Sequence, residues 1–183
     1  MTDEPLAPPQ DDKDWTWVLH EPCPECGFDA AALDRGDIPG LIRASAANLA
    51  AALARRDAAA RCEPHVWSAL EYGCHVRDVC RVFDARLERM LAEDDPLFAN
   101  WDQDETALAE RYWAQDPATV AAELTESAEA IAQGFAAVDG DQWQRPSRRG
   151  NGSVFTVDSF GRYFMHDLVH HVHDVQDVQD ISG

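Results

Sequence analysis

The C-terminal part of the chain contains a dense cluster of side chains that can bind metal. Four of the seven histidines fall between residues 166 and 173, in a segment whose apolar residues have helical spacing. His166 and His170 lie one turn apart on such a helix, so the pair can hold one divalent ion. His173 competes with His170 as the second ligand but lies nearer the helix end. His171 points elsewhere, toward solvent or a connecting segment, and is assigned no role.

A further histidine, His75, lies about two turns into another amphipathic segment. It sits beside the apolar stripe that includes Leu70 and Cys74, so its ring can face the helix that carries the cluster. Three imidazoles with an open fourth position are typical of a catalytic zinc site. The alternative for His75 is a buried histidine satisfied by a neighbour. The alternative for His166 and His170 is a polar helix face near a C-terminus, where imidazolium is favoured.

Several charged residues can assist such a site. Glu71 precedes His75 by one turn and can serve as a general base, although Ser68 and Glu71 also match a capping box. Asp167 and Asp174 can orient ligand imidazoles from behind. A basic loop before the last helix can receive a substrate carboxylate or remain a solvated loop, and its arginines are Arg145, Arg148 and Arg149.

A second candidate metal site lies nearer the N-terminus. Cys23 and Cys26 form a CxxC motif, and Cys62 with His65 supplies a CxxH partner on the far side of a predicted helix. Together these four residues can make a structural zinc site. The alternative is a turn with two partly buried thiols.

Composition limits the partners of the protein. Its 183 residues include 34 acidic and 15 basic side chains, for a formal charge of −19, which repels nucleic acid and anionic membranes. No apolar run approaches the roughly 20 residues of a membrane-spanning helix, and the start of the chain does not resemble a signal peptide. These features predict a cytoplasmic protein. Residues 1–14, acidic and proline-rich, are expected to form a disordered tail before a single domain at 15–183.

Four amphipathic helices are predicted within that domain. Helix-start signals and helical spacing place them at about 38–56, 67–92, 117–140 and 156–175. No alternating pattern long enough to predict a strand is present, except at 153–157. The second and third helices are joined by the longest connection, 93–115, which can cross the bundle and make these two helices parallel. The prediction is an all-α four-helix bundle of up-down-down-up topology.

With these elements in place, the chain resembles the DinB/YfiT-like four-helix metalloproteins, which include mycothiol-dependent maleylpyruvate isomerase and bacterial thiol-dependent S-transferases. The likeness rests on the segment from Trp67 to Asp78 with its histidine, on the long connection around Trp101, and on the HxxxH motif at 166–170. It spans most of residues 37–177, and a C-terminal domain like that of the isomerase is not expected. The resemblance implies a divalent metal, zinc first and nickel second, bound by His75, His166 and His170.

The resemblance favours a metal-dependent S-transferase or isomerase that activates a low-molecular-weight thiol such as mycothiol toward a small electrophile. Two alternatives remain. The same ion can activate water for hydrolysis of a small substrate, or the protein can be a non-catalytic metal-binding stress or interaction protein. The sequence assigns no catalytic residue beyond the metal ligands, does not identify the acceptor, and leaves a homodimer open.

Overall fold

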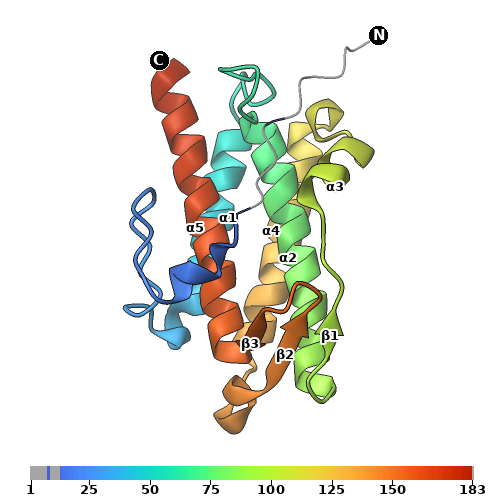
Figure 1. Cartoon of the computed structure of the whole chain (residues 1–183). Helices are drawn as coiled ribbons and strands as arrows, with labels where there is room; N and C mark the ends of the chain where they lie inside the picture. Colours follow the sequence, from blue (N-terminus) through green and yellow to red (C-terminus); the bar gives the residue numbers. More distant parts are fainter. Residues whose placement is uncertain (1–7, 9–12, 183) are drawn as a thin grey trace.

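Four long helices dominate the computed structural model of the protein, which describes residue 8 and residues 13–182 (Figure 1). They are α1 (Ile38–Leu53), α2 (Ala69–Ala92), α4 (Pro117–Ala136) and α5 (Val157–Ser182). The all-α bundle predicted from the sequence is confirmed. The helices begin where the start signals place them, but α1 and α4 end about one turn earlier than predicted. None of the described helices is long and apolar enough to cross a membrane.

Contacts between helix ends define the topology. The space beside Gly161, near the start of α5, is filled by Ile38 at the start of α1 and by Phe135 at the end of α4. Helices α1 and α5 are therefore parallel, and α4 runs opposite to both. Late in α2, Leu87 contacts Gly134 late in α4, so these two helices are parallel to each other. The predicted up-down-down-up order is present.

Aromatic packing holds α5 in the bundle. The ring of Phe83 on α2 stacks on Phe160 of α5, with centroids 4.6 Å apart. One turn further along α5, Phe164 contacts both Phe83 and Phe135 of α4. A β-carbon added at Gly161 would lie 3.0 Å from the Phe135 ring, so glycine permits the close approach of α5 to its neighbours. The histidine-bearing turns that follow are thus anchored by a close-packed core.

Ser68 and Glu71 fix the start of α2. The Ser68 hydroxyl accepts a hydrogen bond from the backbone N–H of Glu71, and the Glu71 carboxylate accepts one from the backbone N–H of Ser68. The same carboxylate is paired with Arg61, and only 2% of Glu71 is exposed. These contacts favour the capping role of Glu71 over that of a general base.

A small sheet lies beside the bundle, and its third strand falls in the segment 153–157 that was excepted from the helical prediction, whereas its first two strands were not predicted. Its strands are β1 (Leu97–Phe98), β2 (Pro146–Arg149) and β3 (Val154–Thr156), with β1 parallel to β2 and β2 antiparallel to β3. Strands this short carry no readable alternation, and the β1–β2 pairing joins distant parts of the chain. The long connection also contains a short helix, α3 (Gln103–Ala109), which begins at the Asp102 cap.

The N-terminal segment packs along α5. It contains a 3-10 helix, η1 (Trp15–Leu19), then a cysteine-containing turn, and then a second 3-10 helix, η2 (Arg35–Asp37), that leads into α1. Figure 1 shows this segment in blue beside α5. Arg162 of α5 donates hydrogen bonds to the backbone carbonyls of Ala30 and Leu33, which ties the segment down. Most of the predicted tail, residues 1–14, lies outside the described residues, so the tail stays a prediction.

Candidate metal centres

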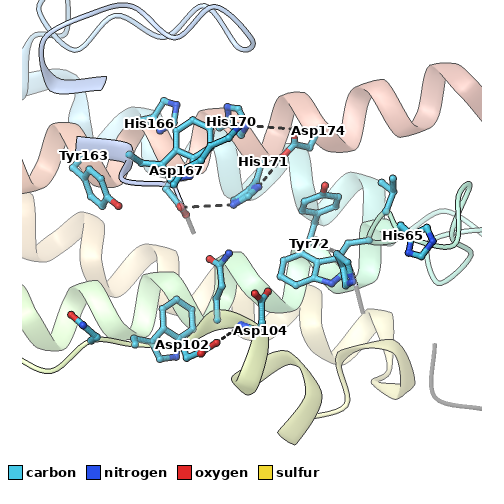
Figure 2. A pocket seen from close by; sticks show the side chains of 18 of the residues that line it. His65, Tyr72, Asp102, Asp104, Tyr163, His166, Asp167, His170, His171 and Asp174 are labelled. Carbon is cyan, nitrogen blue, oxygen red and sulfur yellow. Dashed lines mark hydrogen bonds and ion pairs between the residues drawn. The ribbon is translucent and has the colours of Figure 1, made fainter. Parts of the chain in front are cut away.

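Helix α5 presents metal-binding side chains in two neighbouring rows. Consecutive residues on an α-helix point about 100° apart, so residues 166 and 170 form one row and residues 167 and 171 the next. In Figure 2 the side chains of His166 and His170 project differently from those of Asp167 and His171. Each row meets a different part of the molecule, and two groups of potential ligands result.

The first group, called here the open group, consists of His75, Asp167 and His171. One ligand atom from each residue lies within 4.8 Å of the others. Nε2 of His75 is 3.9 Å from Oδ2 of Asp167, and Nε2 of His171 is 3.8 Å from Oδ1 of the same carboxylate. The two imidazole rings meet edge to face, with centroids 4.7 Å apart. Helices α2 and α5 thus bring two imidazoles and one carboxylate to a common point.

His75 is completely buried between aromatic side chains. Its ring stacks on Trp101 at 5.8 Å and also contacts Trp67. Neither ring nitrogen has a hydrogen-bond partner among the described residues. Burial, and secondarily the neighbouring His171, lowers the pKa of His75 well below its usual value. A neutral imidazole with unused nitrogens is the form that binds a metal ion.

Asp174 orients His171 from one turn further along α5. Nδ1 of His171 lies 2.9 Å from Oδ2 of Asp174, and because a carboxylate only accepts, the ring donates this hydrogen bond. Nε2 then keeps its lone pair on the side of Asp167. Such outer carboxylates commonly orient metal-binding histidines. Asp174 has the orienting position expected from the sequence, whereas Asp167 lies in the ligand group itself.

The second group, called here the closed group, consists of Cys23, Cys26, His166 and His170. Their ligand atoms also lie within 4.8 Å of one another. Sγ of Cys23 is 3.7 Å from Nδ1 of His170, and both side chains are buried. The CxxC motif therefore meets the HxxxH motif of α5. Cys62 and His65, the partners considered in the sequence, belong to neither group of the described residues, and Cys62 is exposed.

The structure divides the three histidines predicted as one ligand set. His75 is grouped with Asp167 and His171, while His166 and His170 are grouped with the two cysteines. The expectation that His171 faces solvent was wrong, because its side chain is only 16% exposed and packs against His75. His173 lies away from both groups, near Asp177 and partly exposed, as expected for a surface residue.

One signal in the sequence pointed to the two members of the open group that were not predicted as ligands. Asp167 and His171 have the same i, i+4 spacing as His166 and His170, shifted by one residue. Spacing alone does not say which of the two pairs faces α2, because that depends on the rotation of α5 about its axis. The packing of Phe160 and Phe164 into the core sets this rotation.

A cavity of about 520 Å³ opens beside the open group (Figure 2). Asp167 and His171 lie on its wall, and His75 lies behind the tryptophans that line it. Of the three loop arginines considered in the sequence, Arg149 lines the cavity. Arg145 instead donates to the backbone carbonyls of Met90 and Glu93 at the end of α2. The aromatic part of the wall comes from the N-terminal segment, the start of α2, the long connection and α5, and comprises Trp15, Trp67, Tyr72, Trp101 and Tyr163.

The fold and these residues define a four-helix bundle in which α5 shares one group of potential metal ligands with α2 and another with the N-terminal segment. The chain belongs to the DinB superfamily, whose family model matches residues 9–175. Among solved structures it is similar to YfiT from Bacillus subtilis, described as a probable metal-dependent hydrolase with an unusual four-helix bundle topology. The TM-score is 0.70 and the identity 16%, over 80% of this chain and 86% of that one. Comparison with curated proteins found none that matches.

Proposed function

We propose that the protein is a metal-dependent enzyme whose divalent ion is held by His75, Asp167 and His171 and acts on small molecules bound in the adjoining cavity. One observation carries the proposal. The open group offers three ligands, and two of them reach the wall of a cavity of about 520 Å³. Catalytic metal sites typically combine three protein ligands with one position left for a reactant. The description of YfiT as a probable metal-dependent hydrolase supports metal dependence.

The residues fit a divalent ion. His75 brings buried nitrogens that have no partner among the described residues, and Asp174 holds His171 with Nε2 turned toward the Asp167 carboxylate. Two imidazoles and a carboxylate suit zinc, and they also suit nickel or iron. A divalent ion held there supplies positive charge that lowers the pKa of a bound thiol or water.

We place thiol transfer first among the reactions. The cavity volume lies within the range of sites for drug-sized ligands, so it has room for a small thiol together with an electrophile. Aromatic side chains on the wall can hold the apolar part of an electrophile. Arg149, with Tyr163 beneath its guanidinium, can receive a carboxylate of the thiol or of its partner. The co-substrate proposed is a low-molecular-weight bacterial thiol of the mycothiol kind.

Hydrolysis of a small substrate is the second candidate. A ligand set of two histidines and one carboxylate recurs in hydrolytic zinc enzymes, and this observation favours it. In that case the cavity holds one substrate and a water molecule, and no thiol is consumed.

The test uses metal-loaded protein incubated with a model electrophile and, in parallel, with mycothiol, bacillithiol, glutathione or no thiol. Metal-dependent loss of thiol supports transfer, and product release without thiol supports hydrolysis. The variant H171A is expected to lose the activity, whereas H173A, a matched change two residues along the same helix, is expected to retain it. Equal turnover by wild type and H171A, or no turnover of any substrate by metal-loaded protein, would count against an enzyme at the open group and favour a non-catalytic binding protein.

A further inference from the structure

The turn that carries Cys23 and Cys26 has a defined shape. The backbone N–H of Gly27 donates to the carbonyl of Cys23 at 2.9 Å, and the N–H of Cys23 donates to the carbonyl of Phe28 at 2.8 Å. Gly27 has a φ of +74°, a left-handed conformation that glycine adopts without strain. These hydrogen bonds form a tight turn. The sulfur atoms of both cysteines lie within 4.8 Å of ring nitrogens of His166 and His170.

The two histidines offer matching nitrogens. Nδ1 of His170 lies 3.7 Å from Sγ of Cys23, close to the roughly 3.6 Å that separates a sulfur and a nitrogen bound tetrahedrally to one zinc ion. Nε2 of His166 is buried and has no hydrogen-bond partner among the described residues, while His166 as a whole is 4% exposed. A buried, unused nitrogen beside two thiols points to a ligand that is shared by all four side chains.

Outer contacts around this group also resemble those of a metal site. Nε2 of His170, the nitrogen that faces away from Cys23, lies 3.4 Å from a carboxylate oxygen of Glu25 and 3.8 Å from one of Asp174. A carboxylate behind the second ring nitrogen is the usual arrangement around a metal-binding histidine. Glu25 lies within the CxxC motif itself, so the same turn supplies two ligands and an outer carboxylate.

A reactive thiol pair does not fit these surroundings. Redox-active cysteines are partly exposed and lie in electropositive surroundings, whereas these two thiols face two imidazoles and one of them is buried. Cys23 is 1% exposed, and the cavity wall includes both histidines but neither cysteine. Four ligands and little solvent access are typical of a structural zinc site, as is C-x2-C followed by H-x3-H.

We propose that Cys23, Cys26, His166 and His170 bind a zinc ion that fastens the N-terminal segment to α5. This site is separate from the open group, and the proposal does not depend on the proposed activity. The ring of Trp15 packs against His166 at 5.4 Å and His170 at 5.2 Å, and Trp15 lines the cavity. The ion therefore also holds one wall of the cavity in place.

The first experiment replaces the bound metal of the wild-type protein with cobalt(II) and records its absorption spectrum. Coordination by Cys23 and Cys26 gives an intense thiolate-to-cobalt charge-transfer band in the near ultraviolet and strong tetrahedral visible bands. The open group has no sulfur ligand, so H75A is expected to keep the charge-transfer band. A cobalt-loaded wild-type protein without that band would overturn the proposal, whatever the fate of the proposed activity.

The second experiment compares metal content after purification. The variants C23S and C26S are expected to lose about one equivalent of zinc per chain, while C62S, a matched change at an exposed cysteine, loses none. C26H, which keeps a ligand at the position, is expected to restore zinc and solubility if the serine variants fold poorly. Undiminished zinc in folded C23S would overturn the proposal, and so would a Cys23–Cys26 disulfide in protein purified without oxidant.

Discussion

The open and closed groups lie side by side on α5 yet differ in the number and the chemical type of the ligands that they offer to an ion. The open group has three ligands, one of them a carboxylate, and two of its residues line a cavity. The closed group has four potential ligands, two of them sulfur, and its two histidines line the cavity as well, but its cysteines do not. A free coordination position allows chemistry, whereas a complete ligand set mainly stabilises the fold. The same helix can thus serve both purposes through adjacent residues.

Charge separates the two groups as well. Two thiolates balance a divalent ion, so a filled closed group carries no net charge, whereas a single carboxylate leaves a filled open group with one positive charge. A neutral neighbour adds little repulsion to the ion in the open group. The remaining positive charge is the one available to polarise a reactant.

The largest expected effect is the loss of a whole ion, and it tests whether there are two sites. We expect H75A and H166A each to remove about one of two bound equivalents per chain, and the double variant to remove both. Elemental analysis of dialysed protein gives these numbers. If H75A, H166A and the double variant all lose the same single equivalent, then His75, His166 and His170 share one ion as predicted from the sequence, and the comparison fails.

The next effect concerns stability and should fall mainly on the closed group. We expect the double variant C23S/C26S to lower the midpoint of thermal unfolding by at least about 10 °C, because an ion that binds only the folded chain contributes its binding free energy to folding. H171A is expected to cause a smaller shift, because the open group has one ligand fewer and no thiolate, so its ion binds less tightly and contributes less to folding. Calorimetry measures both. A larger shift for H171A than for the double variant would reverse the assignment.

A smaller effect is expected from the carboxylate behind His171. Replacing Asp174 by asparagine leaves Nδ1 of His171 without its charged acceptor and should weaken metal binding at the open group by about 10- to 100-fold. Asp177, which lies 3.3 Å from His173, provides the matched control, and D177N should leave the affinity unchanged. Competition with a metal-binding dye measures the affinity. Asp174 also lies 3.8 Å from His170 of the closed group, so D174N alone could affect both groups. In C23S/D174N the closed group is already disabled, and the affinity measured is that of the open group.

No change in zinc content is expected at Cys62 and His65, the alternative zinc ligands considered in the sequence. We expect C62S and H65A to retain the wild-type zinc content, since neither residue joins a ligand group in the part of the chain that the structure describes. Loss of one equivalent of zinc in either variant would instead support the site formed by Cys23 and Cys26 with Cys62 and His65.

Local signals in the sequence were enough for the helices but not for the ligand sets. Pro39, the Ser68–Glu71 capping box and the Asp116–Pro117 pair act within one turn, so they predicted the helix starts. The partner of Cys23 was out of reach, because it depends on how residues 15–37 cross α5. The choice between His166 and Asp167 as the residue facing His75 depends on a rotation of about 100°, which aromatic packing decides. The strand β1 was missed because its partner lies about 50 residues away, and short local patterns do not encode such pairing.

The interleaving of the two rows on α5 has a thermodynamic consequence. An ion bound by His166 and His170 limits the rotation and sliding of the turn that also carries Asp167 and His171. Whatever filling one group does to the affinity of the other, linkage requires the reverse effect to be equal in free energy. Zinc bound at the closed group would then change the affinity of the open group for its ion. Titration calorimetry measures both affinities and therefore the order in which the two groups fill.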